Sequence, residues 1–210
     1  MHRRHFMYIT AAGLIAGCNR VEPASARDAS PSSPPPRPKQ SVTPATAQCA
    51  PTSRDLRGPY WTPDAPHVAH LVPKGDLRIE GLVKGPDCTP ISGATVHVWQ
   101  ADPKGEYAED RLRGRMATGS DGGYRFETIR PGRYLQPSGW RPAHIHFEVT
   151  APGYQPLISQ LYFADDPYLG AKDSCGVCRS NDPQRIIALK QVVVPYQRTE
   201  GVFEIHLAKA

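Results

Sequence analysis

Residues 141–147 read Arg-Pro-Ala-His-Ile-His-Phe. In a β-strand the side chains of residues i and i+2 point to the same face, so His144 and His146 project together, while Ile145 and Phe147 project to the other face. An apolar face of this kind is typical of a strand that packs on a core. The stretch therefore predicts a strand with a buried apolar face and two converging imidazoles opposite it.

Strand signals continue on both sides of this stretch, as short alternating or apolar runs separated by Gly, Pro, Asn and Asp. The predicted strands are Leu77–Val83, Thr95–Ala101, Tyr124–Ile129, His144–Thr150, Ile158–Phe163, Ile186–Val194 and Gly201–Leu207. No long segment keeps a helical period, and we expect helix only as a turn or two near Pro167–Ala171. The pattern predicts an all-β domain, an antiparallel β-sandwich with long loops and little helix.

Two tyrosines upstream of the histidines, Tyr107 and Tyr134, each lie in a glycine-containing, loop-like context. Ferric iron prefers anionic oxygen donors and accepts imidazole, and two phenolates with a hydroxide would balance its charge in a buried site. Glu148 shares the strand face of the histidines but lies one step further along, and we expect it to be exposed. The residues thus favour an iron site of two tyrosines and two histidines.

The motifs around these residues extend over a large part of the chain and occur in a specific order. In that order the chain resembles the intradiol ring-cleavage dioxygenases, most closely the protocatechuate 3,4-dioxygenase branch, over roughly residues 56–168. The resemblance implies a prealbumin-like β-sandwich. The motifs that carry it are Glu80–Val83, Ile91–Asp102, Gly105–Tyr107, Thr118–Tyr134, Arg141–Phe147 and Ser159–Phe163.

The resemblance also implies a role for each of the four candidate ligands. Tyr107, Tyr134, His144 and His146 match the residues that bind Fe(3+) in this family. Tyr134 matches the tyrosine that leaves the metal when substrate binds, so it has a catalytic role as well.

Three further residues match the family's substrate pocket. Arg141 matches the arginine that stabilises charge developing on the substrate, and Gln160 matches the pocket glutamine. Tyr60 lies in Gly58-Pro59-Tyr60-Trp61, which is similar to the segment that lines the substrate entrance. The alternatives are a surface salt bridge for Arg141, a strand-edge amide for Gln160 and a simple turn with a core aromatic for Tyr60.

The activity implied by the resemblance is that of an Fe(III)-dependent intradiol dioxygenase, which cleaves a catechol-type ring with O2 to a cis,cis-muconate-type product. Two alternatives stay open. A non-catalytic prealbumin-like binding module would explain the chain as far as Tyr134, but not Arg141, the two histidines or Gln160. A hydrolase using a different metal would keep the histidines. Colour separates these classes, because tyrosinate bound to iron(III) is red-brown and zinc sites are colourless.

The ends of the chain predict export. Residues 1–18 resemble a twin-arginine signal that ends in a lipobox, Ile15-Ala16-Gly17-Cys18, in which Cys18 would be lipidated. Residues 19–48 are rich in Pro, Ser, Thr and Ala and predict a disordered tether. We expect the protein to be lipid-anchored to a bacterial membrane, on its periplasmic face or at the cell surface, with no other membrane contact.

The remaining residues, 49–210, suit one dioxygenase-like domain with a sizeable core. The formal net charge of the chain is +5, and loss of residues 1–17 would remove Arg3 and Arg4 and leave +3. So mild and even a charge does not predict binding to nucleic acid. The expected partners are a catechol-type small molecule and O2, and the sequence leaves the oligomeric state open.

Four cysteines follow Cys18, and an even count in an exported protein predicts disulfides. Three pairings are open from the sequence, of which we favour Cys49–Cys88 and Cys175–Cys178. The Cys-x-x-Cys spacing of the second pair is also used in zinc and redox sites. No second such pair and no thioredoxin-like pattern accompanies it, so a disulfide is favoured.

Overall fold

The computed structural model describes residues 49–193 and 197–210 of the chain. The predicted signal at residues 1–18, including Cys18, and the predicted tether at residues 19–48 lie outside this range. Within the part of the chain that is described, none of the helices has the length and hydropathy that crossing a bilayer requires.

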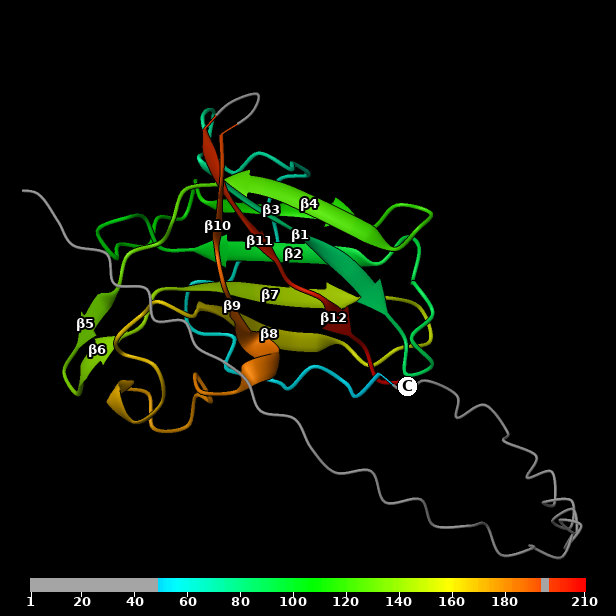
Figure 1. Cartoon of the computed structure of the whole chain (residues 1–210). Helices are drawn as coiled ribbons and strands as arrows, with labels where there is room; N and C mark the ends of the chain where they lie inside the picture. Colours follow the sequence, from blue (N-terminus) through cyan, green and yellow to red (C-terminus); the bar gives the residue numbers. More distant parts are fainter. Residues whose placement is uncertain (1–48, 194–196) are drawn as a thin grey trace, which may run out of the picture. The chain divides into compact units, whose positions relative to one another are not determined.

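One five-stranded sheet carries the His-x-His stretch and has the strand order β3-β2-β7-β8-β9 (Figure 1). Its strands are β2 (Thr95–Gln100), β3 (Arg113–Ala117), β7 (His144–Thr150), β8 (Leu157–Phe163) and β9 (Ile186–Ile187). β7 lies between β2 and β8 and pairs antiparallel with both. The histidines therefore sit in the middle of the sheet, where the backbone is held on both sides.

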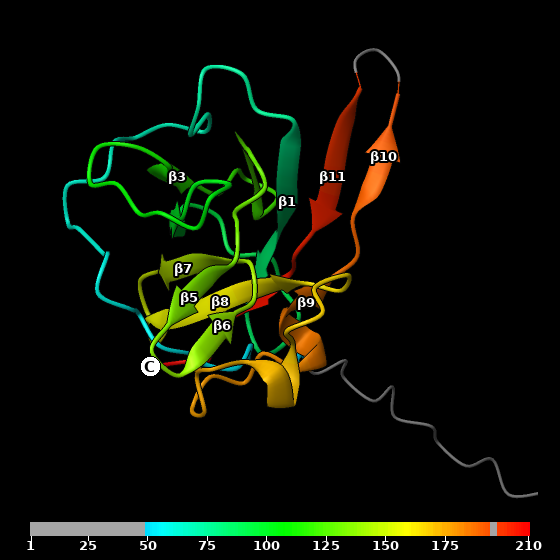
Figure 2. The ribbon, with the colours of Figure 1, turned by 90° about the vertical axis from the view of Figure 1, so that its left-hand side faces the viewer.

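The second five-stranded sheet is built around β1, with β4 along one edge and β11 followed by β12 along the other. Figure 2 shows β1, β11 and β10 side by side in one layer. The strands are β1 (Leu77–Lys84), β4 (Gly123–Thr128), β10 (Lys190–Val192), β11 (Arg198–Val202) and β12 (Ile205–His206).

A short hairpin, β5 (Tyr134–Gln136) and β6 (Gly139–Arg141), stands at the end of the sheet where β7 begins (Figures 1 and 2). The helical content of the described residues is two 3-10 turns, η1 (Gly170–Lys172) and η2 (Pro183–Arg185). The hairpin delivers Tyr134 and Arg141 from neighbouring positions, because these two residues pair across it.

The core between the two five-stranded sheets is apolar and aromatic. Phe147 of β7 packs edge-on against Phe126 of β4 and also contacts Phe203, with ring centroids 6.0 and 5.1 Å apart. All three side chains are almost completely buried. The alternation of β7 directs Ile145, Phe147 and Val149 into this core, as the sequence predicts.

Every predicted strand overlaps a strand of the structure, and the predicted turn near residues 167–171 overlaps η1. The sandwich is nevertheless not purely antiparallel, because β1 pairs parallel with β11 and β12, and β8 pairs parallel with β9. These parallel partners come from the C-terminal quarter of the chain, which runs alongside strands that precede it in the sequence. Strand alternation alone does not contain this information, since it gives no direction of pairing.

The sequence did not predict β3, β5 or β6. β3 reads Arg-Gly-Arg-Met-Ala, without the apolar alternation of a half-buried strand. Its arginines donate to backbone carbonyls of the N-terminal segment: Arg113 to Tyr60 O at 3.0 Å and Arg115 to Ala65 O at 2.8 Å. Tertiary contacts therefore stabilise a strand that its composition disfavours.

The structure contains the two disulfides favoured from the sequence, Cys49–Cys88 and Cys175–Cys178. The first fastens the start of the described domain to the turn between β1 and β2. The second closes a tight turn between η1 and η2.

Candidate metal and substrate site

The outer face of the β7 sheet, which points away from the apolar core, carries a row of polar and aromatic side chains. His146 pairs with Trp99 on β2 and with Gln160 on β8, and His144 pairs with Tyr162 on β8. Directly paired residues in a sheet share a face. Strand register alone therefore places both histidines, Gln160 and Tyr162 side by side.

This outer face is buried although it lies outside the sandwich core. His144 and His146 are each 2% exposed and Gln160 is 0% exposed. The cover is formed by segments from elsewhere in the chain, since Gln160 Nε2 donates to Leu56 O at 2.8 Å. Loops thus convert one face of a sheet into a buried polar site.

The loop after β2 places Tyr107 over the histidines. Gly105 has φ +86°, a conformation that L side chains rarely adopt, and a Cβ there would lie 2.3 Å from Arg133 O. The glycine lets this loop pack directly against the segment that leads into Tyr134. The two candidate tyrosine ligands, 27 positions apart in the sequence, are brought together in this way.

The four predicted ligands converge. The hydroxyl of Tyr107 lies 3.3 Å from His144 Nε2 and 3.1 Å from His146 Nε2. Tyr134 joins them, with its ring centroid 5.8 Å from that of Tyr107 and 5.7 Å from that of His144. Two imidazole nitrogens and a phenol oxygen therefore face one point, with a second phenol beside it.

The environment keeps both imidazoles neutral, as metal ligands must be. Burial lowers the pKa of His144 to about 3 and the pKa of His146 well below its usual value, and nearby Arg141 adds to both shifts. His144 Nδ1 lies 2.7 Å from Pro142 O, so it is the protonated nitrogen and Nε2 keeps its lone pair for a ligand. Burial also raises the pKa values of Tyr107 and Tyr134.

This donor set fits ferric iron. A bound cation can remove the proton of a coordinated group at neutral pH, which would overcome the raised pKa values of the two phenols. Ferric iron gains most from two phenolates. Among the described residues, no group of three or more His, Cys, Asp or Glu side chains could hold a metal ion. The oxygen donors beside these histidines are the tyrosines.

A buried polar network borders the ligands. Arg141 is 4% exposed, and its Nη2 donates to Gln160 Oε1 at 2.9 Å and to Tyr162 Oη at 3.2 Å. Its Nη1 lies 3.4 Å from Tyr134 Oη. Arg141 is therefore not a surface salt bridge and Gln160 is not a strand-edge amide, because the structure joins them beside a candidate ligand.

The Gly-Pro-Tyr-Trp segment at residues 58–61 lies directly against the ligands. Tyr60 is 44% exposed and stacks on Tyr107, with ring centroids 4.0 Å apart and an interplanar angle of 6°. Gly58 has φ +71°, and a Cβ there would lie 3.1 Å from His146 Cε1. Trp99 stacks on the same imidazole at 4.9 Å. The half-exposed Tyr60 thus stands where the buried site meets solvent.

The family model described as Dioxygenase matches residues 57–208. The chain belongs to the intradiol ring-cleavage dioxygenase family. It is 37% identical over 161 residues to a chlorocatechol 1,2-dioxygenase of Rhodococcus opacus, which covers 61% of this chain and 62% of that protein. It is 33% identical over 147 residues to a catechol 1,2-dioxygenase of Candida albicans, which covers 56% and 48%. The chain thus spans about half to three fifths of these relatives.

Solved structures of intradiol dioxygenases share the fold. The dioxygenase domain of a dioxygenase carbohydrate-binding protein fusion from Streptomyces sp. SirexAA-E is 34% identical, with a TM-score of 0.65, and the match covers 77% of this chain and all of that one. The 3-chlorocatechol 1,2-dioxygenase of Rhodococcus opacus gives a TM-score of 0.69 at 26% identity, covering 76% and 73%. The all-β architecture is therefore that of this family.

Two residues beside this site, Asp55 and Glu148, were missed or misjudged from the sequence. Asp55 was missed: it accepts from Tyr162 Oη at 2.9 Å and also pairs with the fully buried Arg185. Glu148, expected to be exposed, is partly buried and accepts from Trp61 Nε1 at 2.8 Å. No local signal marked these residues, because their partners are about 90 to 130 positions away in the chain.

Proposed function

We propose that this protein is an Fe(III)-dependent intradiol dioxygenase, which cleaves a catechol-type ring with O2 to a cis,cis-muconate-type product. One observation carries the proposal: two histidines and two tyrosines converge beside a buried arginine–glutamine pair. Relatives named for chlorocatechol, catechol and hydroxyquinol support a catechol-type substrate.

Tyr107, Tyr134, His144 and His146 would hold the metal. When bound there, ferric iron would supply the charge that ionises the two phenols and draws in both oxygens of a catechol. Tyr134 is the ligand proposed to give way to substrate, and its phenolate oxygen can then take a catechol proton.

Arg141 is placed to act on the substrate rather than on the metal. Its Nη1 points toward the oxygen of Tyr134, the position that substrate would enter. A fixed guanidinium in a buried site stabilises negative charge as it develops, at little cost of reorganisation. Gln160 holds the other side of the Arg141 guanidinium by accepting a hydrogen bond from Nη2. Tyr60 lines the entrance of the site, where its ring can contact the aromatic ring of a substrate.

The decisive experiment combines metal analysis with oxygen uptake on the purified protein. We expect about one iron per chain, a red-brown colour that shifts when catechol is added, and O2 consumption matched by a ring-opened dicarboxylate. Stoichiometric zinc in a colourless protein would favour the hydrolase. Protein that binds catechol without consuming O2 would favour the binding module.

We further propose that the protein is exported and anchored through lipidated Cys18. The disulfides support this location, because such bonds persist in oxidising compartments. Cys18→Ala should move the protein from the membrane fraction to the soluble fraction. Wild-type protein that is already fully soluble after export would contradict the anchor and leave the enzyme proposal intact.

A further inference from the structure

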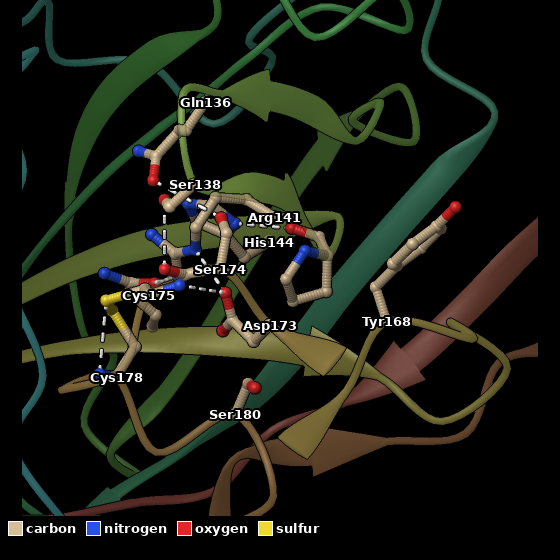
Figure 3. Close-up of polar contacts among 12 residues, drawn as sticks. Gln136, Ser138, Arg141, His144, Tyr168, Asp173, Ser174, Cys175, Cys178 and Ser180 are labelled. Carbon is tan, nitrogen blue, oxygen red and sulfur yellow. Dashed lines mark hydrogen bonds and ion pairs between the residues drawn. A yellow bond between two sulfur atoms is a disulfide. The ribbon is translucent and has the colours of Figure 1, made fainter. Parts of the chain in front are cut away.

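Arg141 is held from two sides, and only one side belongs to the sheet. Gln160 and Tyr162 of β8 accept from Nη2. On the opposite side Nε donates to Asp173 Oδ1 at 2.8 Å (Figure 3). Asp173 lies on the loop after η1, 32 positions from Arg141 in the sequence.

The geometry of a guanidinium makes the second anchor decisive. Its five N–H groups form a rigid planar fork, so fixing Nε and Nη2 also fixes the direction of Nη1. Nη1 is the nitrogen beside Tyr134. Without an acceptor at Nε, the fork could turn about its contacts with β8, and Nη1 would lose its direction.

Asp173 is itself immobilised. Its side chain is 0% exposed, and Oδ1 accepts a second hydrogen bond from the backbone N–H of Cys175 at 2.9 Å. Its Oδ2 is buried without a hydrogen-bond partner in the described ranges, so the carboxylate accepts its hydrogen bonds through Oδ1 alone.

The loop that carries Asp173 is closed and fastened to the hairpin. The Cys175–Cys178 disulfide closes the turn, and Cys178 N donates to Cys175 O at 3.1 Å. Ser174 N donates to Trp140 O at 3.0 Å, and Ser138 Oγ donates to Ser174 O at 3.2 Å (Figure 3). The loop is therefore tied to the strand that ends in Arg141.

We propose that Asp173 is a positioning residue, which orients Arg141 toward the substrate and thereby sets the turnover rate. The inference rests on the proposed function, because it assumes that Arg141 acts on the reacting ring. Among the described residues, Asp173 forms hydrogen bonds with Arg141 and Cys175 and with none of the four candidate ligands, so its hydrogen bonding reaches the reaction through Arg141.

Two substitutions test this role. Asp173→Asn keeps an acceptor at Oδ1 and removes the charge, whereas Asp173→Ala removes the acceptor. Removing a residue that orients a site residue lowers activity by about 10- to 100-fold. We expect kcat per bound iron to fall by about 10-fold for Asp173→Asn and about 100-fold for Asp173→Ala, with iron content and visible spectrum unchanged.

Asp165→Asn is the matched control. Asp165 makes an equally close bidentate pair with Arg130, at 2.6 and 2.8 Å, but on the surface and without a hydrogen bond to Arg141 or to a candidate ligand among the described residues. Its kcat should equal that of the wild type. A role limited to folding would instead lower thermal stability or iron content at unchanged kcat per iron.

A double-mutant cycle gives the sharpest test. If Asp173 acts through Arg141, adding Asp173→Asn to Arg141→Ala should cause no further loss of kcat. Full additivity, or wild-type kcat per iron in both Asp173 variants, would overturn the proposal.

A structure of Asp173→Ala separates this inference from the proposed function. If the wild-type protein does not cleave catechol, the enzyme proposal fails. The position of Arg141 in Asp173→Ala still shows whether Asp173 orients it. A guanidinium that leaves its place between Gln160 and Tyr134 supports positioning by Asp173. One that stays there overturns it.

Discussion

At its N-terminal half β7 is buried on both faces, but the two faces are buried by different means. On the inner face Ile145, Phe147 and Val149 pack against apolar side chains of the opposite sheet. On the outer face His144 and His146 are covered by loops that carry Tyr107 and Gly58, and Trp99 of the neighbouring β2 stacks on His146. Apolar burial needs only volume and shape, whereas polar burial needs a partner for each donor and acceptor. Alternate residues of one strand therefore serve two purposes: those on the inner face stabilise the core, and the two histidines on the outer face form the candidate site.

The neighbours His146 and Phe147 should fail in opposite ways. Phe147→Ala leaves a cavity in the aromatic core and should lower the free energy of unfolding by about 3–5 kcal/mol. His146→Ala should lose most of the iron and all ring cleavage, with a smaller loss of stability. Iron analysis and denaturant unfolding of both variants measure the contrast. Full iron retention in His146→Ala would refute the ligand assignment.

Within the outer face, Tyr134 should differ from the histidines. If it is the ligand that leaves, Tyr134→Phe should keep the fold and most of the iron, change the colour and slow catechol binding about tenfold or more. Stopped-flow absorbance after mixing with catechol measures both. A visible spectrum identical to that of the wild type would mean that Tyr134 is only a packed aromatic side chain.

Gly58 tests how tightly the loop cover fits the outer face. Gly58→Ala places a Cβ at φ +71° and 3.1 Å from His146 Cε1. The backbone strain alone should cost about 1–2 kcal/mol. Gly153→Ala is the control, because its φ is +78° and a Cβ there meets nothing within 4 Å. We expect both variants to lose the same unfolding free energy and only Gly58→Ala to shift the visible spectrum. That result would show that the added Cβ presses on His146. If both variants keep the wild-type visible spectrum, the segment around Gly58 does not pack tightly on His146.

The effect that is smallest at neutral pH is expected at the edge of the same face. Burial lowers the pKa of His97 to about 4, below its unfolded value of about 6.5. Between these pH values the unfolded chain binds a proton that the folded chain does not, so stability falls as pH falls, by at most ~1.4 kcal/mol per pH unit.

Substituting His97 should remove its share of this slope, to which the buried His144 and His146 also contribute. His97→Phe should make the fall in unfolding free energy between pH 6.5 and pH 4 shallower, whereas the exposed His67→Gln should leave it unchanged. Urea unfolding at a series of pH values measures the slope. A wild-type slope in His97→Phe would assign the acid sensitivity to other groups.

The sequence predicts the inner face well and the outer face in part. Alternation is a local signal, so it locates β7 and its apolar residues, and the family motifs pick out the four candidate ligands, Arg141 and Gln160, which the structure brings together. Asp173 was missed because it stands in a polar loop without periodicity, and its partner lies 32 positions away. Glu148 was misjudged because strand phase predicts direction but not what covers the strand.

The segment at residues 49–61 is both the first part of the described domain and a wall of its site. It is covalently joined to the rest at its start, where Cys49 bonds to Cys88 in the turn between β1 and β2. A mechanical load applied upstream of Cys49 would therefore pass through the disulfide into the body of the sandwich. The disulfide offers that force a path besides the backbone through Leu56 and Gly58, which lie beside Gln160 and His146. The crosslink therefore lowers the force that would reach the site.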